Sequence, residues 1–160
     1  MKDKISIDRI QQLHPLVRDT FSNFITDCEN EFEITLRIML PVFRTIAEQD
    51  ELYSHGRNGD SRPIVTNAKG GTSFHNFGLA VDLCEINKIG EVDWTYDNST
   101  LVPIANKYGL EWGGGWIHMK DKPHFQIRTI NGITYSENCS DLLSKVNNGE
   151  IDENGYINTF

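Results

Sequence analysis

The sequence predicts a single-domain α+β protein in which a central antiparallel sheet has helices packed to one side. Apolar residues recur at helical spacing between residues 6 and 26, whereas Phe32 to Leu40 alternates apolar and polar side chains like a half-buried strand. Asn131-Gly132, a tight-turn pair, separates two further segments of strand character. A chain of 160 residues is long enough to bury one sizeable core, so we expect residues 1–160 to form one domain.

The predicted helices follow from spacing and capping signals. In the N-terminal helical part, residues 6–26, Pro15 can open a second short helix, and the polar run 27–31 is expected to end it. Thr45 and Glu48 form a capping box that starts the next helix, which runs to about His55. Two later helices are expected, one capped by Ser99 or Thr100 and ending at Gly109, and a short one over residues 141–146.

The remaining segments predict the sheet and its loops. Leu79 to Ile86 is apolar and is expected to be a central strand, and Pro123 to Ile130 is another. Ile133 to Tyr135 follows the turn as a return strand, so residues 129–160 would hold a hairpin, a short helix and a tail without a clear pattern. Residues 57–72 read as a long loop, and long loops in compact domains tend to be functional.

Composition excludes several classes of function. The net charge of −8 and the lack of a Lys/Arg cluster argue against nucleic-acid binding. No segment is apolar for long enough to span a bilayer, and the polar N-terminus lacks the apolar region of a signal peptide, so we expect synthesis in the cytoplasm and no membrane insertion. Three scattered cysteines predict buried free thiols instead of a disulfide framework, and we expect a monomer.

Two short phrases carry the chemistry: Ser73–Asp82 (SFHNFGLAVD) and Asp121–Phe125 (DKPHF). They offer His75, Asp82 and His124 as ligands for one divalent metal, with Asp121 as a spare carboxylate. Two histidines and one carboxylate leave a fourth zinc position for water, which is typical of a catalytic site. The spare carboxylate is the general base that a zinc hydrolase needs.

The ligand set has competitors among the other histidines. His118 lies only six residues before His124 and is an alternative ligand, whereas His14 and His55 have no other potential ligand nearby and are expected to be structural. Asp82 interrupts an apolar run, and an unpaired buried carboxylate is costly, so metal ligation would account for it.

These phrases resemble the motifs S-x-H-x-x-G-x-A-x-D and D-x-P-H-F of the D-alanyl-D-alanine carboxypeptidase-like (VanY-like) zinc metallopeptidases. Within that family the chain is most similar to L-alanyl-D-glutamate endopeptidases, which include many bacteriophage endolysins. Supporting phrases occur in the family's order and cover about residues 36–128: FRTIAEQ (43–49), LYSHGR (52–57), IVTNA (64–68), GGTSFHN (70–76) and GLEWGG (109–114). The resemblance implies the fold that these peptidases share with the hedgehog signalling domain.

The resemblance also implies roles for single residues. His75, Asp82 and His124 would bind Zn²⁺, and Asp121 would take the position of the catalytic carboxylate. Arg44 matches the family arginine near the substrate, where its charge would stabilise the oxyanion or hold a substrate carbonyl.

Other residues match positions near the active site. Ser73 and Gln49 are expected to contact the substrate. Trp112 and Trp116 lie in a Gly-rich stretch, where they belong to the core or line the cleft, and Trp112 is assigned to substrate binding. Gly115 and His118 depart from the family pattern, in which a polar or acidic residue and a small polar residue are usual, and both could alter substrate contacts.

The implied activity is zinc-dependent hydrolysis of the peptidoglycan stem peptide, at the L-Ala–D-Glu bond as in endolysins. The alternatives are a D-Ala–D-Ala carboxypeptidase or dipeptidase, and a non-catalytic zinc-binding module of a phage particle. With no signal peptide, an enzyme of this kind would act on the cell wall after phage- or holin-mediated release. Asp121 and Arg44 argue against the non-catalytic alternative, which has no need of a base.

Overall fold

The computed structural model describes residues 1–160 and confirms the predicted α+β class. The main sheet has the order β1-β2-β5-β4, with β3 paired to the far end of β2, and all its pairs are antiparallel. Its strands are β1 (Leu36–Ile38), β2 (Ala80–Ile86), β3 (Val92–Asp93), β4 (Leu110–Trp112) and β5 (His124–Ile127). The two-stranded hairpin β6 (Thr129–Ile130) and β7 (Ile133–Thr134) stands apart from it.

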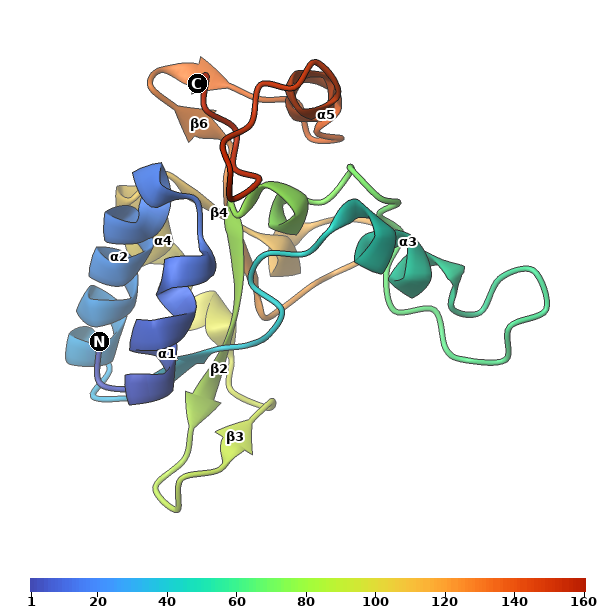
Figure 1. Ribbon diagram of the computed structural model, residues 1–160. Helices are drawn as coiled ribbons and strands as arrows, with labels where there is room; N and C mark the ends of the chain where they lie inside the picture. The colour runs from blue at the N-terminus through green and yellow to red at the C-terminus, as the bar shows by residue number, and fades with distance from the viewer.

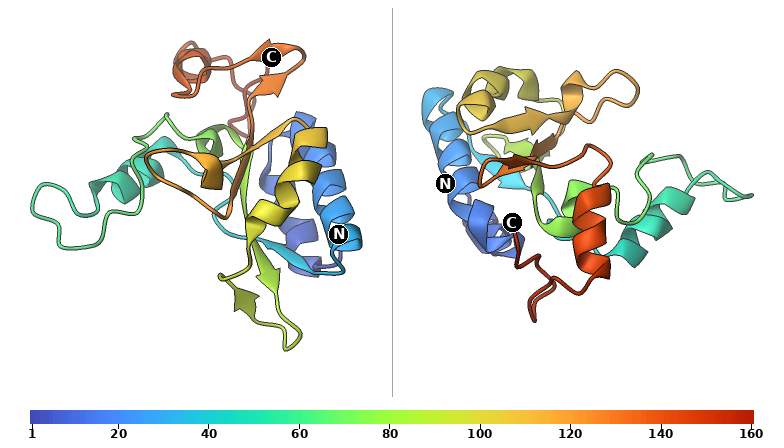
Figure 2. Two further views of the ribbon diagram at one scale, coloured as in Figure 1. Left: turned by 180° about the vertical axis from the view of Figure 1, so that it is seen from behind. Right: turned by 90° about the horizontal axis from the view of Figure 1, so that it is seen from above.

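The helices do not all lie on one face of this sheet. On one side of β2 are α1 (Lys4–Arg9), α2 (Arg18–Glu31) and α4 (Val102–Lys107), whereas α3 (Ile46–Ser54) lies on the other (Figures 1 and 2). The first group covers the core: Phe24 of α2 packs on Phe125 of β5, with ring centroids 5.2 Å apart. The opposite face of β2 and β5 therefore stays available for polar side chains.

The N-terminal helical part forms as predicted but extends further. Pro15 begins a short 3₁₀ helix, Pro15–Val17, that leads directly into α2. The predicted break at 27–31 is wrong, because α2 continues to Glu31. Glu29 is buried in its last turn, where its carboxylate accepts hydrogen bonds from the backbone N–H groups of Lys2 and Leu36.

The first strand is shorter than its alternating pattern suggests. β1 keeps only three residues of the predicted strand from Phe32 to Leu40. Glu33 has φ of 54°, outside the extended region, and Leu40 at the other end is 54% exposed. The alternation of apolar and polar residues in the sequence is thus longer than the segment that pairs with β2, which is only Leu36–Ile38.

The α4 region also differs in detail. Asp97, not Ser99 or Thr100, provides the cap, because its side chain accepts from the N–H of Ser99 at the start of a 3₁₀ turn, Asn98–Leu101. The helix proper starts one residue before Pro103, a favourable place for proline.

The C-terminal segment joins the same core. Asn131 and Gly132 both have positive φ, which confirms the tight turn, and α5 (Ser140–Asn147) follows. The tail, which showed no sequence pattern, is anchored by Ile157: its side chain is 2% exposed and its carbonyl oxygen lies 2.7 Å from Nε2 of the buried His14. One cluster of buried side chains thus runs from Ile10 to Ile157. No helix of the chain has the length and apolar character that crossing a bilayer requires.

Candidate metal centre

His75, Asp82 and His124 lie together on the sheet face that α1, α2 and α4 leave uncovered. Asp82 of β2 and His124 of β5 are direct cross-strand neighbours, and their side chains approach to 3.2 Å between Oδ1 and Nδ1. His75 comes from the preceding 3₁₀ turn, with Nε2 3.4 Å from the same carboxylate oxygen. One potential ligand atom from each residue lies within 4.8 Å of the others.

The turn that brings His75 to this face depends on Gly78. Gly78 ends the 3₁₀ helix Phe74–Phe77 with φ of 66°, a conformation that favours glycine. A Cβ atom there would also lie 2.7 Å from the backbone nitrogen of His14. The chain therefore folds back into β2 only because this position has no side chain.

Each imidazole makes a hydrogen bond through the ring nitrogen that faces away from the three candidate ligands. Nδ1 of His75 lies 3.0 Å from the carbonyl oxygen of Val42, and Nε2 of His124 lies 3.0 Å from Oε1 of Gln126. Both partners are oxygen acceptors, so each outer nitrogen donates a hydrogen bond, and the inner nitrogen is the one that can bind a metal once it gives up its own proton. This is the arrangement found around metal-ligating histidines, and the donor set fits a divalent metal such as zinc.

Asp82 is ready to act as a ligand in its charged form. Burial works to raise the pKa of this carboxyl, but His75 and His124 outweigh burial and hold the pKa well below its usual range. The aspartate that interrupts an apolar strand is therefore ionised beside the two imidazoles.

Asp121 lies in the turn just before β5. Its backbone N–H donates to the carbonyl of Gly113, and its own carbonyl accepts from the N–H of His124. Partial burial raises the pKa of Asp121, His124 opposes this shift and Asp82 adds to it. The carboxyl thus belongs to the same electrostatic environment as the candidate ligands, which is where the sequence predicts the base.

Arg44 lies on the segment that leads into α3. Its backbone N–H donates to the carbonyl of His75, and Asn76 Nδ2 donates to the Arg44 carbonyl, which ties the two segments together. Burial lowers the pKa of the guanidinium, while Asp82 and Asp121 raise it. Its Nε is buried and has no hydrogen-bond partner in the protein.

Gln49 has a different place from the one predicted. Its side chain is fully buried; Oε1 accepts from Arg44 Nη1 at 2.7 Å and Nε2 donates to the carbonyl of Ala68 at 2.8 Å. No polar atom is left for the predicted contact with substrate. The geometry makes Gln49 a residue that orients Arg44.

Trp112 also differs from its assignment. In the β4–β5 register Trp112 is opposite Phe125, so its indole lies on the core face and not on the face of His124. Its Nε1 donates to the carbonyl of Lys122 at 2.7 Å, and Asn98 Nδ2 donates to the same oxygen at 3.1 Å. Trp112 therefore stabilises the turn that contains Asp121 through this hydrogen bond.

Trp116, not Trp112, is the tryptophan beside the candidate ligands. Its ring lies 5.2 Å from that of His124, centroid to centroid, and 38% of the residue is exposed. Ser73 is partly exposed just before His75, so this geometry allows its predicted substrate contact. His118 is exposed and outside the group, which removes the competing ligand.

Sequence reasoning missed Gln126, although a signal was present. Gln126 is a polar residue, 5% exposed, two positions after His124 in a buried strand, and residues two apart share a face of a sheet. The predictions that His14 is structural and that all three cysteines are free and buried are confirmed: His14 is buried, and both its ring nitrogens have hydrogen-bond partners.

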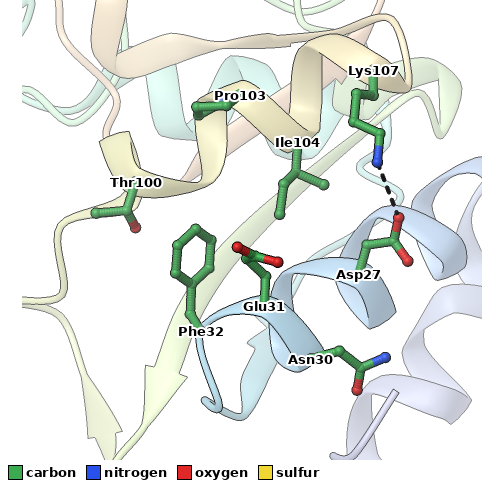
Figure 3. A pocket seen from close by; sticks show the side chains of 8 residues that line it. All are labelled: Asp27, Asn30, Glu31, Phe32, Thr100, Pro103, Ile104 and Lys107. Carbon is green, nitrogen blue, oxygen red and sulfur yellow. Dashed lines mark ion pairs between the residues drawn. The ribbon is translucent and has the colours of Figure 1, made fainter.

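A separate pocket lies on the helical side, between the end of α2 and the start of α4. Figure 3 shows Phe32, Ile104 and acidic side chains around it, with an ion pair between Asp27 and Lys107 at 3.8 Å. It contains no histidine, and it lies on the side of β2 that carries α2 and α4 (Figure 1). The candidate chemistry is therefore confined to the other face.

Known proteins with the same motifs define the class of this chain. A family profile described as D-alanyl-D-alanine carboxypeptidase matches residues 66–127, a span that includes His75, Asp82, Asp121 and His124. Peptidoglycan L-alanyl-D-glutamate endopeptidase CwlK of Bacillus subtilis (strain 168) is 36% identical over 126 residues, covering 72% of this chain and 73% of that protein. The chain therefore belongs to the D-alanyl-D-alanine carboxypeptidase-like (VanY-like) family of metallopeptidases.

Solved structures agree on the fold. The L-Ala D-Glu endopeptidase ChiX of Serratia marcescens matches with a TM-score of 0.52 and 24% identity, over 78% of this chain and 86% of that one. The LD-carboxypeptidase LdcB matches with a TM-score of 0.51 and 18% identity, over 82% of this chain and 70% of that one. The α+β architecture is thus that of this peptidase family.

Proposed function

We propose that this protein is a zinc-dependent peptidoglycan peptidase that cuts the L-Ala–D-Glu bond of the stem peptide. The observation that carries the proposal is the convergence of His75, Asp82 and His124 on one sheet face, with Asp121 and Arg44 in the same electrostatic environment. The 36% identity to CwlK, whose name states this bond, supports the choice of substrate.

In this proposal His75, Asp82 and His124 hold the metal. Bound zinc would supply a Lewis acid and make a water molecule more acidic. Asp121 takes the proton of the attacking water and returns it to the leaving amine, the work of a general base and then a general acid. Arg44 offers positive charge to the oxyanion that develops on the scissile carbonyl.

We extend the proposal to the whole chain and its setting. Residues 1–160 would act as one peptidase domain, as a monomer, with Ser73 close enough to His75 to contact the stem peptide. Because the motifs are most similar to those of endolysins, we propose a phage or prophage lysis enzyme that reaches the cell wall after holin-mediated release.

A second candidate is a D-Ala–D-Ala carboxypeptidase. The observation in its favour is the family profile matched by residues 66–127, whose description names that activity. The same residues would then act on the terminal D-Ala, and bond choice would depend on how the stem peptide lies beside Ser73 and Trp116.

Digestion of purified peptidoglycan, with and without a chelator, separates these activities. We expect new D-Glu amino termini that disappear with chelator and are strongly reduced with an Asp121→Asn variant. Release of free D-Ala without new D-Glu termini would select the carboxypeptidase. Zinc binding without either product would contradict a peptidase and leave a non-catalytic zinc module.

A further inference from the structure

Gln126 connects the candidate ligand His124 to a charged pair at the edge of the sheet. Oε1 of Gln126 lies 3.0 Å from Nε2 of His124, and its Nε2 donates to Oε2 of Glu111 at 3.2 Å. The other carboxylate oxygen of Glu111 accepts from Nε of Arg128 at 2.8 Å. His124 and Gln126 are both 5% exposed, so water does not replace these contacts easily.

The sheet register builds this chain of contacts. Glu111 of β4 is directly opposite Gln126 of β5, and Gln126 is two residues from His124 on the same face. Arg128 follows on the same side, two residues further along. Strand pairing therefore holds Glu111, Gln126 and His124, and Arg128 lies just past the end of β5.

Donor and acceptor chemistry then orients each group in turn. A carboxylate only accepts hydrogen bonds, so Glu111 requires the NH₂ group of Gln126 to face it. The amide oxygen of Gln126 must then face His124, which places the imidazole proton on Nε2. Nδ1 of His124 is left facing Asp82, on the side where a metal would bind.

The two histidines differ in what fixes them. The outer nitrogen of His75 is held by the backbone carbonyl of Val42, which no side-chain substitution removes. The outer nitrogen of His124 is held by a side chain, which in turn depends on Glu111 and Arg128. His124 is thus the ligand whose orientation the sequence can adjust.

We propose that Gln126, oriented by Glu111 and Arg128, is a positioning residue that fixes the tautomer and ring orientation of His124 and thereby strengthens metal binding. The inference rests on the metal site proposed above. Removal of an outer hydrogen-bond partner of a metal-binding histidine typically weakens metal affinity about 10- to 100-fold. Gln126 would act only through His124, so it is not a catalytic residue.

The test measures zinc affinity by competition with a chromophoric chelator, without any substrate. Gln126→Met removes both polar atoms at similar volume and should weaken zinc binding about 10- to 100-fold. Gln11→Met makes the same chemical change at an exposed position of the N-terminal segment and should leave affinity unchanged. Circular dichroism and Tm of each metal-free variant show whether it is folded.

An exchange of the two side chains gives a sharper test. In the Glu111→Gln, Gln126→Glu double variant, the carboxylate that now stands on β5 accepts from His124 and from the amide that now stands on β4. The oxygen of that amide in turn accepts from Arg128. Complementarity is kept with the same net charge, so the double variant should bind zinc within a few-fold of the unmodified protein. Glu111→Gln alone lets the Gln126 amide turn over, and we expect it to bind more weakly than the exchanged pair.

The outcomes separate this inference from the proposed function. If the unmodified protein binds no zinc, or His75→Ala binds as well as the unmodified protein, the metal site itself is wrong. If His75→Ala abolishes binding but folded Gln126→Met keeps full affinity, the metal site stands and the role of Gln126 is refuted. An exchanged pair no better than Glu111→Gln alone would contradict the orientation by Glu111.

Discussion

Asp121 and Asp82 show how two nearby carboxyls take different states from their surroundings. His75 and His124 hold the pKa of Asp82 well below its usual range against the effect of burial. Partial burial and the charge of Asp82 instead raise the pKa of Asp121, with His124 opposing them. One carboxylate is thereby suited to bind a cation and the other to exchange a proton, as expected where environment assigns acid–base roles.

Replacement of the proposed base should separate catalysis from metal binding. Asp121→Asn keeps the shape of the side chain but cannot take a proton, and we expect turnover to fall about 10²- to 10⁴-fold while zinc content is unchanged. Asp19→Asn, an exposed aspartate on α2, is the matched control. Full peptidoglycan cleavage by Asp121→Asn would remove this residue from the mechanism.

Arg44 and Gln49 should behave as one unit. Arg44→Met removes charge from the oxyanion position and should lower kcat/KM about a hundred- to thousand-fold. Gln49→Met should cost less, because Gln49 acts through its 2.7 Å hydrogen bond to Arg44. In a double-mutant cycle Gln49→Met should then add little to Arg44→Met. Additive losses would mean that Gln49 has a separate role.

At the scale of helices and strands, the sequence predicted the elements better than their ends or faces. The capping box of Thr45 and the Asn131-Gly132 turn are local signals, and both formed as predicted. The predicted end of α2 was wrong because the carboxylate of Glu29 accepts hydrogen bonds from the backbone N–H groups of Lys2 and Leu36. The local sequence does not reveal these partners.

The same limit applies to the candidate site. The motif resemblance pointed to His75, Asp82 and His124, and the structure brings them together. Trp112 was assigned to the cleft because motif position does not tell which face of a strand a residue occupies. That information comes from register, since Trp112 pairs with Phe125 of the core. Register likewise joins Gln126 to Glu111, two residues far apart in sequence.

The turn that carries Asp121 gives a prediction at this scale. Trp112→Phe keeps an aromatic ring on the core face but removes the N–H that donates to the Lys122 carbonyl, leaving only Asn98 to hold that oxygen. Loss of one hydrogen bond costs about 1 kcal/mol, or roughly 2–4 °C in Tm for a chain of this size. We also expect kcat to fall with little change in KM. The turn positions Asp121, whereas Trp112 itself does not face the site. A rise in KM alone would restore Trp112 to substrate binding.

At the scale of the whole molecule, Asp3 joins the first helix to the sheet. We therefore expect the stability of the fold to decrease in acid. Its carboxylate accepts from Ser6 of α1 and forms a two-point ion pair with Arg37 of β1, at 2.9 and 3.1 Å. Burial works to raise the pKa of Asp3, but the bonds from Arg37 and Ser6 outweigh it and lower the pKa from its ordinary value near 3.8. Because the folded-state pKa is lower than that of the unfolded chain, the stabilisation is complete above about pH 4 and is lost as pH falls through the folded value.

Asp3→Asn tests this directly by chemical denaturation across pH. At pH 7 we expect a loss of about 2 kcal/mol in the free energy of unfolding, the size of a charged hydrogen bond together with a helix cap. The difference from the unmodified protein should shrink as pH falls below about 4 and should vanish only below the lowered folded-state pKa, where Asp3 is protonated in both states. Asp8→Asn, an exposed neighbour on α1, should show neither effect. A difference that stays constant with pH would mean that the charge of Asp3 contributes nothing.

Metal binding should stabilise the whole fold, because the candidate ligands join β2, β5 and the 3₁₀ turn between Phe74 and Phe77. A ligand that binds only the folded state at 100 times its Kd adds about 2.7 kcal/mol, which corresponds to roughly 5–11 °C in Tm. We expect zinc to raise Tm by this amount and a chelator to reverse it. His75→Ala should abolish the response, whereas His118→Ala removes an exposed histidine outside the group and should keep it. A response that survives in His75→Ala or disappears in His118→Ala would place the metal elsewhere, because linkage follows the residues that bind and not those that are merely near.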